Sequence, residues 1–189
     1  MEQRPTAELV REHEAITRML KVMEEISDRL EAGEEVDPDD LEGIVDFIRV
    51  FADTCHHGKE EDLLFVEMEK AGVPREGGPL EVMDREHAMG RKYVAQLDDA
   101  IKHYREDRGD RDVALAIIEN ARSYASVLTS HISKENNILY PMANERLTGE
   151  QQQKLVEGFE CVEREKVVAG KHEQYHRLLE ELERKYTQK

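Results

Sequence analysis

Histidine and glutamate recur at matched positions in the two halves of the chain. Each half carries a Glu-His pair and, about forty residues later, a His-x-x-Lys-Glu motif: Glu12-His13 and His56 to Glu60, then Glu86-His87 and His131 to Glu135. His13 precedes His87 by 74 residues, and His56 precedes His131 by 75. Imidazole and carboxylate together suit iron, manganese or zinc. The repeat therefore predicts a metal site built from two similar halves.

The spacing within each motif fits a helix. Residues four apart on a helix point the same way, so His56 with Glu60, and His131 with Glu135, can each offer an imidazole and a carboxylate to one centre. All four repeated histidines also fall in phase with apolar stripes of helical period. Four histidines and two glutamates at one level are too many for one small ion, and carboxylates can bridge, so a dinuclear site is predicted.

The alternative is a set of exposed helix pairs, because any single His-x-x-x-Glu arises by chance. Four histidines in phase with four apolar stripes are harder to explain that way. Burying so many ionisable groups without a metal would be costly, so we favour the metal site.

The breaks between the stripes indicate how the helices connect. Asp37-Pro38 supplies a cap and a first-turn proline, Gly72 to Pro79 reads as a loop, and Arg108 to Asp110 is a turn. Short connections favour antiparallel neighbours. We predict an all-α fold, an antiparallel up-down-up-down four-helix bundle with an additional C-terminal helical segment. Thr148-x-x-Gln151 is predicted to form a capping box that opens that segment.

Composition narrows the class of protein. The 189 residues carry a formal charge of −16 with a pI near 5.0, which argues against a sequence-independent grip on nucleic acid. No stretch resembles a membrane span or a signal peptide, so we expect no membrane association and a cytoplasmic location. Cys55 and Cys161 lack the spacing of a disulfide framework or a thiolate zinc site.

On these residues, together with Leu63-Leu64-Phe65 and Ile138 to Pro141, the chain resembles the hemerythrin-like (HHE cation-binding) family. The resemblance covers about 6–146 and implies residues 1–147 as the bundle and 148–189 as a helical extension packed on it. It implies two non-haem iron ions in an oxo-bridged centre, preferred over zinc or manganese. It further implies which residues bind each iron. Glu60 and Glu135 would bridge the two irons, His13 and His56 would bind largely one iron, and His87 and His131 would bind the other.

One position departs from the oxygen-carrying hemerythrins. They have a second histidine one turn after the third-helix ligand, where this chain has Arg91, which stays protonated and cannot bind a metal. His57 is the first candidate to replace it, and a register with His57 and Glu61 facing the core is also helically sound. His172 and His176 in the tail are further candidates, as is solvent.

The expected function is to bind dioxygen or a related small ligand, such as nitric oxide or peroxide, for carriage, sensing or protection. Two other classes stay open: a catalytic di-iron enzyme, which turns over peroxide or nitric oxide or donates iron for cluster repair, and an iron or zinc protein for storage or sensing. The sequence does not separate these, so whether the protein is an enzyme is left open, as are its protein partners.

Overall fold

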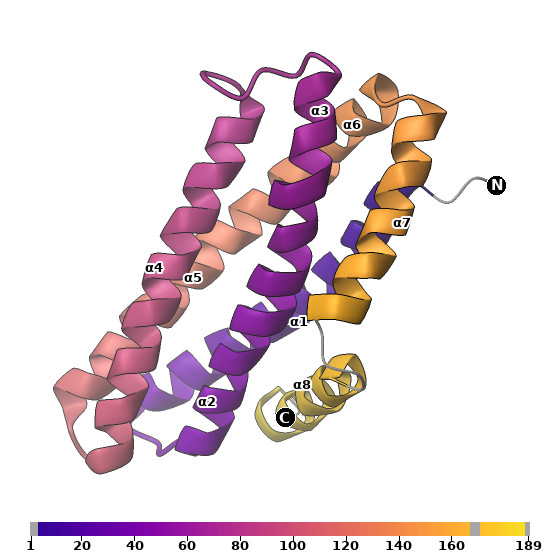
Figure 1. The fold of residues 1–189 in the computed structure, drawn as a ribbon. Helices are drawn as coiled ribbons and strands as arrows, with labels where there is room; N and C mark the ends of the chain where they lie inside the picture. The colour runs from indigo at the N-terminus through magenta and orange to yellow at the C-terminus, as the bar shows by residue number, and fades with distance from the viewer. Residues whose placement is uncertain (1–3, 167–170, 188–189) are drawn as a thin grey trace.

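The computed structural model describes residues 4–166 and 171–187, and it contains no strand in those ranges. Helices stack end to end into four rods, each antiparallel to the next in the chain (Figure 1). The elements of the rods, in chain order, are α1 (Pro5–Glu31), then α2 (Pro38–Phe47), η1 (Ile48–His57), η2 (Glu60–Leu64) and α3 (Phe65–Lys70), then α4 (Pro79–Glu106), and finally α5 (Arg111–Lys134), η3 (Glu135–Leu139) and α6 (Tyr140–Arg146). The predicted all-α fold is confirmed. No helix of the described residues is long and apolar enough to cross a bilayer.

The predicted breaks lie between the rods, and the cap expected at Asp37 is present. The Asp37 carboxylate accepts a hydrogen bond from the Asp39 amide, with Pro38 at the first helical position. Asp110 accepts from the amide of Asp112 at the start of α5. In the loop before α4, Gly77 has a φ of 68°, a left-handed conformation that glycine adopts without a side-chain clash.

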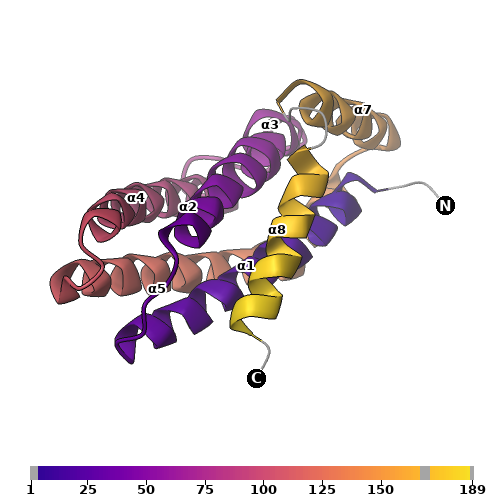
Figure 2. The ribbon, with the colours of Figure 1, turned by 90° about the horizontal axis from the view of Figure 1, so that it is seen from below.

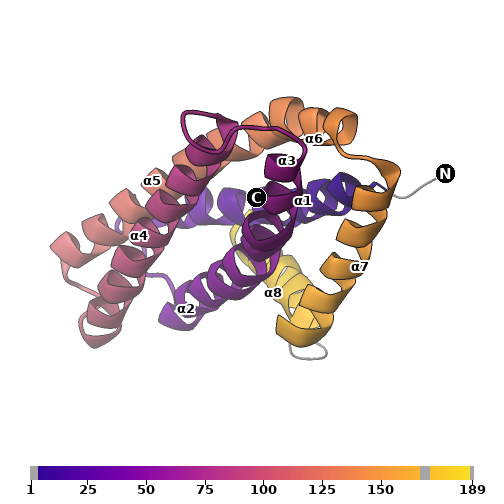
Figure 3. The same cartoon turned by 45° about the horizontal axis from the view of Figure 1, so that its top comes forward.

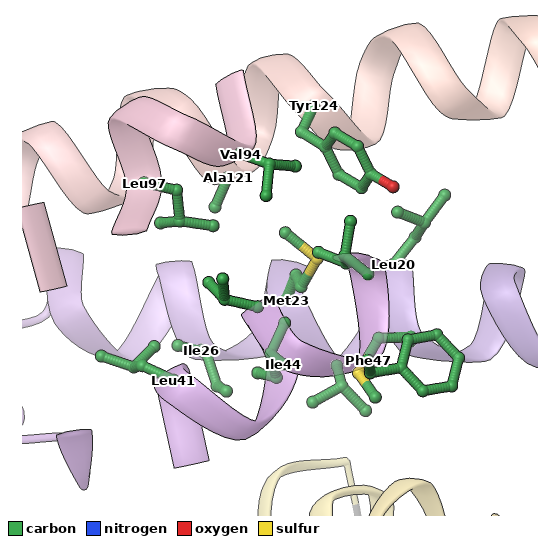
Figure 4. Close-up of a cluster of buried hydrophobic side chains, with 14 of the residues drawn as sticks. Leu20, Met23, Ile26, Leu41, Ile44, Phe47, Val94, Leu97, Ala121 and Tyr124 are labelled. Atoms are coloured by element: carbon green, nitrogen blue, oxygen red, sulfur yellow. The ribbon is translucent and has the colours of Figure 1, made fainter. Parts of the chain in front are cut away.

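The apolar interior consists of two clusters. The larger one joins α1, α2, α4 and α5; Figure 4 shows Leu20, Met23 and Ile26 of α1 below Leu97 and Val94 of α4. The smaller one lies around α3, η3 and α6. Along each rod, the ligand candidates fall between members of the two clusters. The buried polar groups therefore form one level that separates two apolar regions.

Three segments at that level are wound as π-helix, in which hydrogen bonds run from residue i to i+5. They contain His56 and His57 in η1, Glu60 in η2 and Glu135 in η3. The wider turn brings neighbouring residues onto the same buried side, and His56 and His57 are only 1% and 4% exposed. π turns are uncommon and often occur at functional sites.

Two further helices follow the bundle, α7 (Gly149–Lys166) and α8 (Lys171–Tyr186). The predicted capping box is confirmed, since Thr148 and Gln151 exchange hydrogen bonds between side chain and backbone. Helix α8 lies across α1 (Figure 2), and its Leu179 and Leu182 join the larger apolar cluster. Helix α7 packs beside α1, η1 and η2 (Figure 3) and contributes Phe159 to the smaller one.

Candidate metal centre

Two groups of buried ligand atoms lie at the polar level. The first joins His13, His56 and Glu135, and the atoms it offers lie within 4.8 Å of one another. A second group with the same spacing combines one carboxylate with three histidines: Glu60, His57, His87 and His131. The rods thus bring together all six repeated residues expected from the sequence, and His57 with them.

Within each group, two imidazole rings face each other through their Nε2 atoms. The Nε2 atoms of His13 and His56 are 3.0 Å apart, and those of His87 and His131 are 2.9 Å apart. Two nitrogens bound at right angles to a metal at about 2.1 Å would be separated by about 3.0 Å. The spacing in both groups is that of two histidines sharing one ion.

The other ring nitrogen of each histidine is occupied. Each Nδ1 lies 2.6–3.1 Å from a side-chain oxygen, and the pairs are His13 with Asn136, His56 with Glu12, His57 with Asp53, His87 with Glu61, and His131 with Glu86. A carboxylate or an amide oxygen can only accept, so in all five rings Nδ1 carries the proton. In the neutral ring, Nε2 then carries the lone pair, and two lone pairs at 2.9–3.0 Å require a cation between them, either a proton or a metal.

The two inner carboxylates lie between the groups. The oxygens of Glu135 are 3.1 Å from His13 Nε2 and 3.0 Å from His131 Nε2, so this side chain joins a histidine of each group. Glu60 Oε2 lies 3.4 Å from His87 Nε2 and 3.7 Å from His56 Nε2.

These carboxylates also provide a test of whether a metal fits. Both oxygens of Glu135 and one of Glu60 are buried without a protein hydrogen bond. Buried carboxylate oxygens are normally hydrogen-bonded or bound to a metal. The carboxylate oxygens and imidazole nitrogens that lack a hydrogen-bond donor lie close together. Oxygen and nitrogen ligands of this kind suit iron, manganese or zinc.

Burial and charge divide the histidines into two kinds. Burial lowers the pKa of His56 and of His57, which keeps both rings neutral. Burial opposes protonation of His87 too, but Glu60 and Glu61 outweigh it and raise its pKa to about 10. At His13, Glu135 raises the pKa in the same way. Two protons can therefore balance the two inner carboxylates, and metal binding would have to displace them.

The contacts of one half repeat in the other. Glu12 binds both His56 and Lys59, and Glu86 binds both His131 and Lys134. Each of these pairs of residues is related by the 74- or 75-residue shift seen in the sequence. The site is thus approximately two-fold symmetric.

His57 breaks this symmetry, because the equivalent position in the second half is Ile132. Its Nδ1 contacts Asp53 at 3.1 Å, and Asp53 accepts a 2.8 Å hydrogen bond from Arg91. Arg91 also donates to Glu61 at 2.7 Å, and Glu61 holds His87. Arg91 therefore holds the two carboxylates, Asp53 and Glu61, that contact His57 and His87. Glu61 lies in this outer layer, and it is Glu60 that faces the inner groups.

A cavity of about 160 Å³ reaches this side of the site. It lies between η1, α4 and α5, and its wall includes His57, Arg91 and Gly90. A Cβ atom on Gly90 would come within 3.4 Å of Tyr124 and Leu128. The glycine thus lets α4 approach α5 closely where the cavity forms.

The tail histidines are placed differently. His176 is exposed, lies beside Phe51, and belongs to neither group. The side chain of His172 lies outside the described residues. Among described residues, the extension reaches the site's surroundings through Glu163, which contacts Lys59 at 2.9 Å.

An all-α bundle whose rods meet at a buried histidine and carboxylate centre is the architecture of helical cation-binding proteins. The model of the hemerythrin HHE cation-binding domain matches residues 4–143, and the chain belongs to this family. Comparisons with curated proteins and with solved structures give no match.

Proposed function

We propose that the chain holds two non-haem iron ions and binds dioxygen or a related small ligand, such as nitric oxide or peroxide. The observation that supports this most directly is the pairing of Nε2 atoms at 3.0 Å and 2.9 Å on either side of Glu135. One ion would be held by His13 and His56, and the other by three histidines, His57, His87 and His131. Glu60 and Glu135 would bridge them.

The ligand numbers of the two positions differ. The position with three histidines needs fewer further ligands than the position with two, so the open site would lie beside His13 and His56. When bound, a pair of ferrous ions supplies two electrons for the reduction of dioxygen. The chain contributes buried walls from Leu64, Phe65 and Leu139, which exclude water from the two metal positions.

Tyr140 lies at the more open position. Its hydroxyl donates a 2.8 Å hydrogen bond to Glu60 and lies 3.3 Å from His13 Nε2. Burial and the neighbouring carboxylates raise the pKa of this hydroxyl, which keeps it protonated. This single proton is donated to Glu60, so the hydroxyl could donate it to a small ligand only in exchange for that hydrogen bond.

The same hydroxyl favours a second candidate function, catalytic turnover of peroxide. A buried phenol beside the open position could deliver a proton to a leaving oxygen. Tyr140→Phe should leave iron content unchanged in either case. It should slow peroxide consumption about 100-fold if the phenol acts as a proton donor, and it should only weaken ligand binding if the protein is a carrier or sensor.

Metal analysis of aerobically and anaerobically purified protein, together with visible spectra, tests the proposal. We expect two irons per chain, the absorption of an oxo-bridged pair, and a reversible change on adding dioxygen to the reduced protein. A colourless protein filled with zinc would contradict the iron proposal and favour storage or sensing. Rapid peroxide consumption without a stable adduct would favour the enzyme.

A further inference from the structure

Lys59 is a fully buried cation next to the centre, with an exposed fraction of 0%. Its Nζ contacts Glu8 at 2.5 Å, Glu12 at 2.6 Å and Glu163 at 2.9 Å. Burial acts to lower the pKa of the ammonium, but Glu12 and the other carboxylates raise it above its usual range. The three carboxylates could enclose a metal, but the lysine already occupies that position.

This cluster connects to the centre through Glu12. One Glu12 oxygen accepts from Lys59 and the other accepts from His56 Nδ1 at 2.7 Å. A carboxylate that accepts from a ligand histidine orients the ring and makes it a stronger base toward the metal. How strongly Glu12 acts on His56 therefore depends on how much of its charge Lys59 neutralises.

The second half of the chain provides a comparison. Lys134 pairs with Glu86, which holds His131, but the side chain of Lys134 is 36% exposed. Among the described residues, Glu86 is its one ion-pair partner. Lys59 is instead shared among three carboxylates, one of them from α7. Helix α7 follows the part of the chain that the family model matches, residues 4–143.

We propose that Glu163 is a positioning residue for His56, acting through Lys59 and Glu12, and that the C-terminal extension thereby strengthens one of the two metal positions. Glu163 draws part of the lysine charge away from Glu12, which leaves Glu12 a better acceptor for the His56 N–H. The position that includes His13 and His56 is then held more tightly than its ligand number alone provides. This inference rests on the proposed function, because it requires a metal at that position.

The test compares Glu163→Gln with Glu157→Gln. Both glutamates are on α7, and Glu157 is exposed and accepts a hydrogen bond from Gln153. The full-length proteins are loaded with ferrous ion, and release to a ferrous chelator is followed with time. Residues that hydrogen-bond a ligand histidine affect metal affinity about 10- to 100-fold. Glu163 acts on His56 through Lys59 and Glu12, so we expect a smaller effect, in which one of the two ions leaves about 3- to 10-fold faster from Glu163→Gln than from the wild type. Glu157→Gln should behave as the wild type, and Glu163→Asp, which retains the charge, should recover most of the loss.

A second measurement separates positioning from general loosening of α7. In zinc-loaded protein, the proton on His56 Nδ1 gives an NMR signal that moves upfield when its hydrogen bond weakens. Glu163→Gln should shift this signal and leave that of His131 in place. Equal shifts of both signals, or equal release from Glu163→Gln and Glu157→Gln, would overturn the inference while leaving the centre intact. A wild-type protein that holds no metal pair would overturn the proposed function and the inference with it.

Discussion

The Nδ1 atom of His56 donates a 2.7 Å hydrogen bond to Glu12, the residue beside His13 in the sequence. One helix thus supplies both a ligand candidate and the partner of the next rod's ligand. Glu86 does the same for His131 at 3.0 Å. In each Glu-His pair of the repeat, the histidine is a ligand candidate and the glutamate accepts a hydrogen bond from the ligand candidate of the next rod.

Replacing either glutamate should weaken the centre without removing a ligand. We expect Glu12→Gln and Glu86→Gln each to lower metal affinity about 10- to 100-fold, because the histidine loses its anionic acceptor. Competition with a chelator of known affinity measures this. Glu14→Gln is the matched control, since Glu14 is exposed on the same helix. Wild-type affinity in both variants would mean that these hydrogen bonds do not support metal ligands.

Glu60 and Glu135 should contribute more to metal binding than Glu61, the neighbour of Glu60. Glu60→Ala or Glu135→Ala removes one of the two proposed bridges, and we expect occupancy to fall to about one ion per chain or less, since ligand count sets affinity. Glu61→Ala removes the acceptor shared by His87 and Arg91 but no inner carboxylate, and it should retain both ions at reduced affinity. Elemental analysis after gel filtration gives the ratio. Equal losses for Glu60 and Glu61 would show that the bridging assignment is wrong.

The contribution of His57 to metal binding can be compared with that of His176 in the C-terminal extension. His57→Ala should weaken one of the two ions about 10-fold or more, because it removes a buried neutral imidazole from the second group. His176→Ala should have no effect, since that side chain is exposed and lies outside both groups. Metal titrations of the two variants decide between them. A loss of metal affinity in His176→Ala but not in His57→Ala would show that the C-terminal extension supplies the ligand in place of His57.

Acid should loosen α7 through Glu67. Hydrogen bonds from Lys154 on α7 and from Lys70 lower the pKa of this carboxyl to about 2. A lowered pKa stabilises the fold above the usual value near 4.5, and the contribution is lost as pH falls from there toward 2. Lys154 is largely exposed, so we expect no more than about 1 kcal/mol.

Urea unfolding of wild type and Glu67→Gln at pH 7 and pH 3 measures this contribution. The difference between the two proteins should be present at pH 7 and reduced at pH 3. A difference that grows in acid would contradict the sign. Glu69→Gln on the same helix serves as the control, because within the described part of the chain its one ion pair is a 3.9 Å contact with Arg75.

Much of the arrangement could be predicted because it follows helical periodicity. His13, His56, His87 and His131 fall in phase with apolar stripes, so folding the stripes together also brings the histidines together. The cap at Asp37 and the turn at 108–110 predicted two of the breaks correctly, because caps and turns act locally. The outer partners were missed, although the repeated glutamates beside His13 and His87 were a usable signal.

Other features are not encoded in local pattern. The π turns around His57 and Glu60 depend on how the rods pack, so spacing by four could not show that two adjacent histidines would both be buried. The burial of Lys59 depends on a carboxylate more than a hundred residues away in α7. Periodicity describes one helix at a time and gives no information on such contacts.

The two-fold repeat has a consequence for how the metal positions can differ. In a symmetric dimer of half-length chains every contact would occur twice, so both ions would have identical surroundings. Here both copies belong to one polypeptide, and each can vary alone: His57 corresponds to Ile132, and Phe65 corresponds to Tyr140. Covalent fusion of the halves thus permits a division of labour in the proposed centre, with one ion anchored by an additional imidazole and the other left beside a phenol.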